Sequence, residues 1–529
     1  MSQTLQVLAE RLYGEIQAGK IQTPKQLDVR KRQLSEGLQL QNLPTNPDLL
    51  PIIQQACGPL SQEQQQLFSI KPVRNLSGVA VLAAMVKPHT CPHGTCVYCP
   101  KGIHHPAPPA YTGDEPAAQR GYRNNFDSFL QVTSRIKQLQ ATGQSTEKCE
   151  LIIMGGTFLS MPEDYQYEFM QGCLDGISGQ RHTTIQESVA ACETSPNRVI
   201  GITMETRPDV AKLSDIQRML TWGSTRVEMG VQSVYDDVLQ KLNRQHTVQT
   251  TIDSTQRLKD SCLKVGYHMM SKLPHSTIER DLAAHLEIFT NPAFRPDMIK
   301  FYPLAVVQNT GVYQMWKRGE YEEMSMEEAI RFYSKLKPQI PEWVRVMRVQ
   351  RDIPSQNISA GVKKTNLRQE VQRHMKELGI KCRCIRCREV GFKHQNEGVW
   401  PVKVELVTRA YEASQGKEYF ISAEDVEQDI LLGFTRLRIP HQPTLPELED
   451  SAYIRELHVY GQSIPIGEQK EKSSQHKGWG KKLLAEAERI AKEEHGLDAM
   501  NIIAGIGVRE YYKKLGYTQN GAFVKKELR

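Results

Sequence analysis

The chain has 529 residues, of which 39% are apolar and 24% are charged. It is too long for one ordinary hydrophobic core and too apolar for a disordered chain, so we expect two or three folded domains. The 67 basic and 60 acidic residues leave a net charge of +7, a weak preference for a polyanionic partner that does not identify one. The 11 cysteines include two groups of three, which excludes the disulfide framework of a small secreted protein and predicts a reducing compartment, the cytoplasm.

Residues 1–74 are predicted to form a helical, basic region without any motif that carries chemistry. The run Arg30-Lys31-Arg32 lies in it, and clustered positive charge favours contact with RNA. No signal peptide is expected at the start of the chain, and the uncharged stretch 76–86 is too short to cross a bilayer. The sequence therefore predicts no membrane association.

Residues 75–342 are predicted to form a barrel of parallel strands. Short apolar runs alternate here with amphipathic helical segments such as 127–140 and 277–289. Six strand–helix repeats in a row imply right-handed crossovers and an α/β fold, here an open, partial (β/α)6 barrel like part of the TIM fold. The predicted strands are 79–86, 151–154, 199–204, 226–231, 264–270 and 298–302. Functional residues are expected in the loops after these strands, because the chemistry of such barrels lies at the carboxyl ends of the strands.

Three cysteines, Cys91, Cys96 and Cys99, follow the first predicted strand in a C-x4-C-x2-C pattern. A four-iron cluster normally takes four cysteine ligands, so three would leave one iron open to a ligand that is not protein. The pattern resembles the radical S-adenosylmethionine (SAM) superfamily, and the resemblance implies a 4Fe-4S cluster with SAM bound at the open iron. The alternative is a structural zinc site, for which His93 or His89 would have to supply the fourth ligand.

Glycine and polar residues follow the next three predicted strands. They are Gly155, Gly156, Thr157, Glu205, Arg207 and Gln232. Taken singly, these residues have ordinary structural interpretations. The glycines would form a turn, and Glu205 and Arg207 would form a structural ion pair. Their order on successive strand ends is similar to that of the radical SAM enzymes, and this resemblance implies contacts with SAM. Lys272, at the end of the fifth strand, is a further catalytic candidate.

Residues 343–398 are predicted to form a linker with a second metal site. Cys382, Cys384 and Cys387 form a tight C-x-C-x2-C group. We favour structural zinc, with His374 or His394 as the fourth ligand. A second iron–sulfur cluster and unliganded thiols are the alternatives.

Basic residues cluster in two runs within the same linker. Arg345, Arg348 and Arg351 recur at every third position, and the segment 376–393 carries six positive and two negative side chains. Such clustering favours RNA as a partner, although either run alone is equally compatible with an ordinary solvated surface.

Residues 399–529 are predicted to form a second α/β domain. Alternating apolar residues from 402 onward, a turn at 414–416 and strands near 430–437 and 452–459 fit antiparallel pairing. A loop with free backbone amides then opens an amphipathic helix and would hold a pyrophosphate group. The loop is Gln475-His476-Lys477-Gly478-Trp479-Gly480.

This Q-x-x-G-x-G loop, with a strand at 499–504 and the segment 511–517 behind it, resembles the GNAT acetyltransferases. The resemblance implies that the loop residues and two tyrosines, Tyr511 and Tyr512, bind acetyl-CoA. It also implies that one of these tyrosines protonates the departing thiolate. Core packing is the alternative role for either tyrosine.

A radical SAM barrel ahead of a GNAT domain resembles the family of the catalytic subunit of Elongator, in its stand-alone form from bacteria or archaea. The stretches that carry the resemblance include 111–116, 154–165, 205–209, 230–233, 348–354 and 382–391. The resemblance implies a transfer-RNA modifying enzyme. A 5′-deoxyadenosyl radical made from SAM would take a methyl hydrogen from acetyl-CoA, the acetyl radical would add to carbon 5 of the wobble uridine, and thioester hydrolysis would leave 5-carboxymethyluridine. The sequence departs from the family pattern at Lys101 and within 271–275.

Two other functions stay open from the residues alone. One is a GNAT-type lysine acetyltransferase for histone-like tails with a non-redox metal domain. The other is an RNA-binding scaffold with decayed sites, against which the intact motifs argue. The expected partners of the leading interpretation are transfer RNA (tRNA), acetyl-CoA and an electron donor for the cluster. A homodimer is compatible with the sequence, and nothing in it indicates accessory subunits of Elongator.

Overall fold

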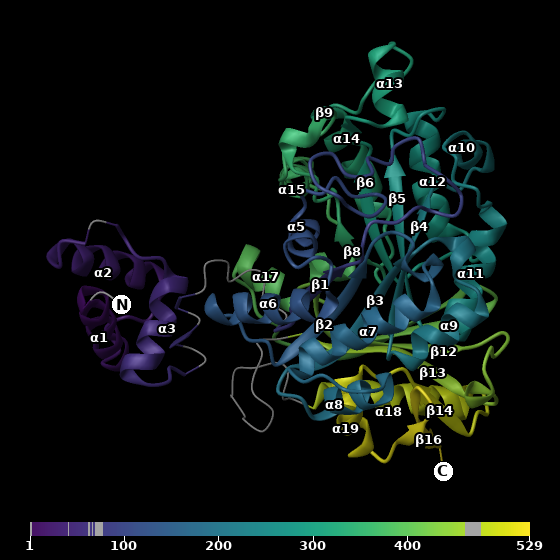
Figure 1. Ribbon diagram of the computed structural model, residues 1–529. Helices are drawn as coiled ribbons and strands as arrows, with labels where there is room; N and C mark the ends of the chain where they lie inside the picture. The colour runs from purple at the N-terminus through teal and green to yellow at the C-terminus, as the bar shows by residue number, and fades with distance from the viewer. Residues whose placement is uncertain are drawn as a thin grey trace.

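The computed structural model describes residues 3–40, 42–61, 64–65, 67–68, 78–460 and 478–528, which form an N-terminal helical region, a barrel and a C-terminal sheet (Figure 1). No helix among these residues is long and apolar enough to span a membrane. The helical region contains α1 (Gln3–Gln17), α2 (Pro24–Gly37) and α3 (Asn46–Cys57), in agreement with the predicted helices. These helices pack around a small apolar core of their own.

Two charges of the predicted basic run are used within this helical region. The Arg30 guanidinium pairs with Glu15 at 2.7 Å. The Lys31 ammonium donates to Asn46 Oδ1 at 2.6 Å, and its side chain is buried. Contact between residues 1–74 and RNA therefore stays a prediction.

The barrel is one parallel sheet whose described strands follow the order β1-β2-β3-β4-β5-β6-β8. All six predicted strands are confirmed. The strands are β1 (Ala80–Met85), β2 (Lys148–Met154), β3 (Arg198–Thr206), β4 (Arg226–Gln232), β5 (Lys264–Ser271), β6 (Met298–Pro303) and β8 (Arg345–Arg348). The short strands β7 (Val306–Val307) and β9 (Ile358–Ala360) form a separate two-stranded sheet.

Helices surround this sheet (Figure 1). They are α5 (Pro116–Arg123), α6 (Ser128–Ala141), α7 (Glu163–Ser178), α8 (Ile185–Thr194), α9 (Leu213–Thr221), α10 (Asp236–Lys241), α11 (Val248–Asp260), α12 (Ile278–Thr290), α13 (Gly311–Lys317) and α14 (Met326–Leu336). The predicted helices 127–140 and 277–289 are α6 and α12, capped by the side chains of Asp127 and Thr277.

The seventh strand, β8, corrects the prediction of six. The arginine spacing of 345–351 by itself indicates a charge cluster, but Arg345 pairs in parallel register with Met298 of β6. In the described chain β1 and β8 are the two edge strands and do not pair with each other. The barrel is therefore open along one side, which we call the seam.

Strand residues alternate between the barrel interior and the outer core, as the period of a strand requires. Val227 and Ile299 are fully buried in the core cluster under the helices. Their neighbours Glu228 and Lys300 line an internal cavity. The interior of the barrel is thus polar, while its outer layer is apolar.

The linker joins the barrel to the C-terminal sheet. It contains α15 (Leu367–Glu377), α16 (Ile385–Arg388) and α17 (Val390–Glu397). The amide of Ile385 donates to the carbonyl of Val344 at the start of β8, at 3.0 Å. The Arg388 side chain is 1% exposed and pairs with Asp429 at 2.8 Å, so α16 is tied to both neighbours.

The C-terminal sheet follows the order β10-β11-β12-β13-β14-β16-β15 in the described chain. Its strands are β10 (Glu405–Ala413), β11 (Gly416–Asp425), β12 (Ile430–Ile439), β13 (Ala452–Val459), β14 (Ala499–Ile502), β15 (Thr518–Asn520) and β16 (Phe523–Glu527). Its helices are α18 (Trp479–Arg489) and α19 (Arg509–Lys513). The parallel pair β13–β14 is joined only from Ala452 to Ile454, so the two strands part beyond that point.

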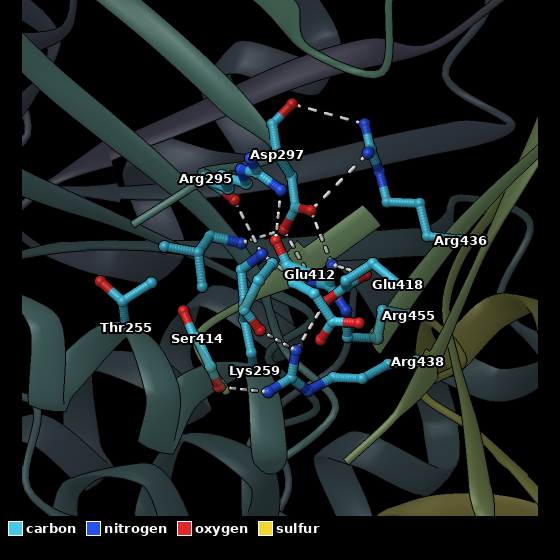
Figure 2. Close-up of polar contacts among 12 residues, drawn as sticks. Thr255, Lys259, Arg295, Asp297, Glu412, Ser414, Glu418, Arg436, Arg438 and Arg455 are labelled. Carbon is cyan, nitrogen blue, oxygen red and sulfur yellow. Dashed lines mark hydrogen bonds and ion pairs between the residues drawn. The ribbon is translucent and has the colours of Figure 1, made fainter. Parts of the chain in front are cut away.

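The C-terminal sheet packs against the amino ends of the barrel strands through buried charges (Figure 2). Asp297, just before β6, receives Arg455 of β13 at 2.6 and 2.7 Å. The same guanidinium reaches Glu418 of β11 at 2.6 Å, and all three side chains are fully buried. Burial would raise the pKa of Asp297, but Arg455 and Lys259 hold that pKa well below its usual range. Since removal of one partner would leave an uncompensated buried charge, this network fixes the two domains relative to each other.

Candidate active site in the barrel

The cysteine loop lies at the carboxyl end of β1 and borders a cavity of about 820 Å³ inside the barrel. Cys96 and Cys99 are buried, and Cys91 is half-buried. The Ala110 amide donates to Cys99 Sγ at 3.1 Å, and Arg244 Nη1 donates to Cys96 Sγ at 3.5 Å. N–H donors directed at sulfur suit thiolates that bind a metal.

The spacing of the three sulfurs fits a cluster better than a single ion. Two sulfurs on one zinc ion at about 2.3 Å each lie about 3.8 Å apart. Among the described residues, Cys91, Cys96 and Cys99 do not form a group of ligand atoms within 4.8 Å of one another, with or without a histidine. Cysteines that bind different irons of one cluster need not be so close. Burial raises the pKa of the Cys91 and Cys99 thiols, so the positive charge of a metal is needed to keep them as thiolates.

Five of the six predicted SAM-binding residues line the same cavity. They are Gly156, Thr157, Glu205, Arg207 and Gln232. Gly155 does not line it. At φ 150°, a Cβ on Gly155 would lie 2.2 Å from Val86 Cγ2, so this glycine lets the turn pack against the end of β1.

The cavity wall presents polar atoms that have no protein partner. Arg207 is 3% exposed and holds Asp209 through Nε at 2.9 Å and Nη2 at 3.0 Å. Its Nη1 atom, and Oε1 of Gln232, are buried without a hydrogen-bond partner in the described chain. Because buried polar groups are normally paired, these atoms fit a bound ligand with anionic and donor groups, as SAM has.

A buried ionic group deeper in the cavity was missed by the sequence analysis. Lys300 of β6 pairs with Glu228 of β4 and lies 3.6 Å from Glu205. His268 of β5 contacts Glu228 Oε2 through Nε2 at 3.0 Å. Burial alone would raise the pKa of Glu228, but Lys300 and His268 hold it well below its ordinary value. The sequence contained one signal for this ionic group. Its charged residues stand at inward-facing positions of strands that are otherwise apolar.

Glu205 is further held by an aromatic hydroxyl. Tyr111, in the loop after the cysteines, donates its hydroxyl to Glu205 Oε2 at 2.6 Å. Burial and the Glu205 charge raise the pKa of Tyr111 well above its usual value, so the phenol keeps its proton. The carboxylate is thus fixed between a phenol and an ammonium group.

Lys272, the predicted catalytic lysine, lies outside this cavity. Its Nζ atom pairs with Glu328 of α14 at 3.1 Å, and it is not among the residues that line the cavity. The residue has a φ of 59° at the end of β5. Among the described residues, the lysines that line the cavity are Lys101 and Lys300.

The second cysteine group is compact. The sulfurs of Cys382, Cys384 and Cys387 lie within 4.8 Å of one another, which is the geometry of ligands that share one ion. His374 and His394 are not in this group of ligand atoms. His374 lies 3.8 Å from Glu377, and the ring of His394 lies 4.2 Å from that of Trp400.

A buried lysine lies beside this second group. Lys337 is 0% exposed and donates to Cys387 Sγ at 3.9 Å. Burial would lower the pKa of Lys337, but the three neighbouring thiol groups raise it. Its ammonium therefore balances negative charge on the sulfurs.

The predicted acetyl-CoA loop is only partly described. Gln475, His476 and Lys477 lie outside the described residues, whereas Gly478 caps α18 with a φ of 74° and Trp479 and Gly480 begin that helix. A Cβ on Gly480 would lie 2.9 Å from the hydroxyl oxygen of Tyr511. The glycine thus allows this hydroxyl to approach the first turn of α18.

The two tyrosines of α19 have different surroundings. Tyr511 is 41% exposed, whereas Tyr512 is 6% exposed and belongs to the core under the C-terminal sheet. Burial raises the pKa of both phenols. Tyr511 is the one that can meet a ligand at α18.

Three family models match the chain. The Radical SAM superfamily model matches residues 85–286, the Radical_SAM C-terminal domain model matches 296–377, and the Acetyltransferase (GNAT) family model matches 390–517. The predicted α/β class, a partial radical SAM barrel followed by a GNAT domain, is confirmed. The first domain implies a 4Fe-4S cluster and SAM, and the second implies acetyl-CoA.

Relatives match over nearly the whole chain. It is 45% identical to the tRNA uridine(34) acetyltransferase of Methanocaldococcus jannaschii, over 99% of this chain and 98% of that protein. It is 44% identical to Elongator complex protein 3 of Homo sapiens, over 92% of this chain and 91% of that protein. Among solved structures it is similar to the archaeal Methanocaldococcus infernus Elp3 with an N-terminus deletion, at a TM-score of 0.77 and 44% identity, over 85% of this chain and 99% of that one. The chain therefore belongs to the family of the tRNA uridine(34) acetyltransferases and the Elongator complex protein 3 subunits.

Proposed function

We propose that this protein modifies the wobble uridine of tRNA anticodons to 5-carboxymethyluridine, with SAM and acetyl-CoA as cosubstrates. The observation that carries the proposal is one cavity lined by three cysteines and by buried polar atoms without a protein partner. A lysine acetyltransferase with a non-redox metal domain, the alternative, would leave this cavity without a role. When bound, the cluster and SAM would supply a radical that can take a hydrogen atom from the acetyl group.

The residues of the cavity would bind and orient the reactants. Arg207, held in place by Asp209, would direct its unpartnered Nη1 at the carboxylate of SAM. The fixed charges of Lys300 and Glu228 would offer a donor and an acceptor to the polar edge of a uracil ring. Because these groups are already paired and ordered, they need no reorganisation when the substrate binds.

The acetyl-CoA domain meets the barrel at the seam. Arg345 of edge strand β8 donates to the hydroxyl of Tyr460, at the end of β13, at 2.8 Å. Beyond Ile454, β13 has separated from β14, which is where a GNAT domain would take its thioester arm. We infer that the acetyl group reaches the cavity along β8.

Tyr511 is the proposed acid for thioester hydrolysis. Water would attack the thioester carbonyl and lose a proton to solvent, the carbon–sulfur bond would break, and the leaving thiolate would take its proton from the Tyr511 hydroxyl, which solvent would then reprotonate. The pKa of Tyr511, raised by burial, keeps that proton in place at neutral pH. Tyr511→Phe is expected to slow hydrolysis about 100-fold, whereas Tyr512→Phe should leave the rate of hydrolysis nearly unchanged, as measured by release of free thiol.

The second cysteine group is proposed to hold structural zinc. Three sulfurs within 4.8 Å of one another suit one tetrahedral ion. The described chain brings neither His374 nor His394 into that group, so the fourth ligand would have to come from another group. The proposed tRNA modification also requires an electron donor for the cluster. It requires a cytoplasmic location, where tRNA is found. It does not require a homodimer.

The test is anaerobic reconstitution followed by nucleoside analysis. The purified protein would receive iron, sulfide, reductant, SAM, acetyl-CoA and a tRNA transcript, and mass spectrometry would look for 5-carboxymethyluridine. A transcript with cytidine at the wobble position is the matched control. We expect the modified nucleoside only with uridine, and only when SAM and acetyl-CoA are both present.

Two outcomes would contradict the proposal. Acetylation of lysine peptides without any change to tRNA would favour the acetyltransferase alternative. A metal at the first cysteine group that is saturated by protein ligands in every preparation would leave no site for SAM.

A further inference from the structure

The wall of the barrel cavity contains a histidine to which the proposed function gives no role. His268 of β5 lines the cavity, and its side chain is 13% exposed. It pairs in parallel register with Lys300 of β6, so the two inward-facing side chains lie next to each other on neighbouring strands. A ring that Lys300 binds through a carbonyl oxygen would therefore lie close to the imidazole.

The hydrogen bond of His268 determines which ring nitrogen carries the hydrogen. Nε2 of the imidazole lies 3.0 Å from Glu228 Oε2. Against the effect of burial, Lys300 and His268 hold the pKa of Glu228 well below its ordinary value, so this carboxylate is ionised and only accepts hydrogen bonds. Nε2 is therefore the donor, and Nδ1 keeps a lone pair in the neutral ring. No residue of the described chain forms a hydrogen bond with Nδ1.

The surroundings of His268 keep its ring neutral. Burial and the Lys300 ammonium lower the pKa of His268, and the opposite effects of Glu228 and Glu205 do not outweigh them. The ring of Tyr302 lies edge-on to the imidazole, with the two centroids 5.4 Å apart. A neutral imidazole with a free lone pair is the form that accepts a proton. Glu228 would then stabilise the imidazolium, as the carboxylate of a Ser-His-Asp triad does.

The proposed reaction needs such a base. Once a carbon radical has bonded to carbon 5 of the uracil, that carbon carries both its hydrogen and the new substituent, and the unpaired electron lies on carbon 6. The double bond between the two carbons returns only when the ring loses one proton and one electron. The carbon–hydrogen bond breaks, and its electron pair together with the unpaired electron supplies the new π bond. The one surplus electron passes to a one-electron acceptor, the class to which an oxidised iron–sulfur cluster belongs.

The neighbours of His268 are poorly suited to take this proton. Glu228 is a weak base, because its pKa lies well below the ordinary value. Lys300 already carries all its protons, because Glu228 raises its pKa against the effect of burial. Tyr111 keeps its hydroxyl hydrogen in the bond to Glu205. Of these groups, His268 alone offers an uncharged lone pair to a ligand in the cavity.

We propose that His268 is the base that takes the proton from carbon 5 of the uridine, with Nδ1 as the accepting atom. The inference rests on the proposed function and adds a catalytic residue to it. Lys300 would donate to the carbonyl oxygen on carbon 4, the neighbour of carbon 5, and would so bring carbon 5 toward His268. The same ammonium would stabilise the negative charge that this oxygen gains as the proton leaves. Nδ1 returns the proton to solvent when the product leaves.

The experiment compares wild type with His268→Gln in the anaerobic assay and separates early from late steps. Glutamine can still donate a hydrogen bond to Glu228 but cannot take up a proton. Formation of 5′-deoxyadenosine from SAM should equal that of wild type, whereas 5-carboxymethyluridine should form about 100-fold more slowly. Without the base, the reductant should convert the ring radical to a 5,6-dihydro nucleoside, which mass spectrometry finds heavier by two hydrogen atoms. His441→Gln is the matched control, since His441 is exposed between β12 and β13 and does not line the cavity.

Chemical rescue completes the test. In His268→Ala, added imidazole should restore product formation in proportion to its concentration, whereas pyrrole, a ring of the same shape without a basic nitrogen, should not. Loss of 5′-deoxyadenosine together with the product, without rescue by imidazole, would show a structural role and overturn the assignment. If wild type forms the modified nucleoside and His268→Gln forms it equally fast, the assignment of the base alone falls. If wild type forms no modified nucleoside, the proposed function falls too.

Discussion

The two three-cysteine groups use the same side chain in different surroundings. The first, Cys91, Cys96 and Cys99, spreads its sulfurs along a cavity that also holds unpartnered polar atoms. The second gathers its sulfurs within 4.8 Å of one another. Its members Cys382, Cys384 and Cys387 contact the main core, and Cys384 is fully buried there.

Surroundings, more than cysteine count, separate a reactive metal site from a structural one. A site for chemistry needs space and free polar atoms next to the metal. A structural site needs closed coordination and packing on every side. Each of the following predictions sharpens this contrast or would remove it.

The largest effect is expected for Cys96→Ser. Loss of one of three cluster ligands should remove the cluster iron and reduce SAM cleavage by more than about a hundredfold. The melting temperature should stay close to that of wild type, because serine is nearly the same size as cysteine and fits the small buried cluster in which Cys96 packs beside the cavity. Iron analysis, an assay of SAM cleavage and thermal unfolding would measure these three quantities. Unfolding of this variant would indicate that the first group is structural.

The reverse pattern is expected for Cys384→Ser. The cluster iron should be retained, while the free energy of unfolding should fall by on the order of 3 kcal/mol, because the buried group loses its metal. Denaturant titration and metal analysis of the purified variant measure both quantities. A stable variant without SAM cleavage would reverse the assignment of the two groups.

Arg207→Gln tests whether the cavity next to the first group binds a charged ligand. A hydrogen bond to a charged group is worth about 1.5–3 kcal/mol, so the dissociation constant of SAM should rise about 10- to 100-fold. Iron content should not change. Calorimetric titration of the reconstituted variant gives the constant, and a value equal to that of wild type would exclude Arg207 from the SAM site.

The smallest effect is expected for Lys337→Met, next to the second group. The variant should bind its metal about tenfold more weakly, because the ammonium no longer offsets the thiolate charge. The pKa of Lys337 is raised above its ordinary value. Lys337 therefore stabilises the folded protein fully at pH values below 10.5, the pKa of the lysine in the unfolded chain. This stabilisation is lost only as the pH rises through the higher pKa of the folded state. Chelator competition at pH 6 and pH 8 should give the same ratio of wild-type to variant affinity, and a ratio that grows toward pH 8 would contradict this charge state.

Much of the fold was predictable because it repeats local patterns. Apolar runs between amphipathic helices gave the six strands β1 to β6, and Asp127 and Thr277 marked helix starts. Strand β8 could not be recognised from its sequence. One of its faces borders the polar interior of the barrel and one of its edges is open, so the strand carries arginines such as Arg345. Charge at such a position looks like a surface run when only the sequence is considered.

The candidate site was predictable where its residues follow strand ends in order, as Gly156, Glu205 and Arg207 do. Lys272 followed the same logic, yet its ammonium pairs with Glu328 outside the cavity. Position along the chain places a side chain at the end of a strand. It does not decide to which side that side chain turns.

The order of the elements, the two cysteine groups and the joining of a radical SAM barrel to a GNAT domain are predictable without a structure, because strand period and ligand spacing are local properties of the chain. Only the tertiary structure decided that Lys300, Glu228 and His268 meet in one cavity, that the sulfurs of one cysteine group are spread and those of the other are close, and that the barrel is open between β1 and β8. These features depend on distances between residues that are far apart in the sequence, and such distances are set by packing and by the pairing of buried charges.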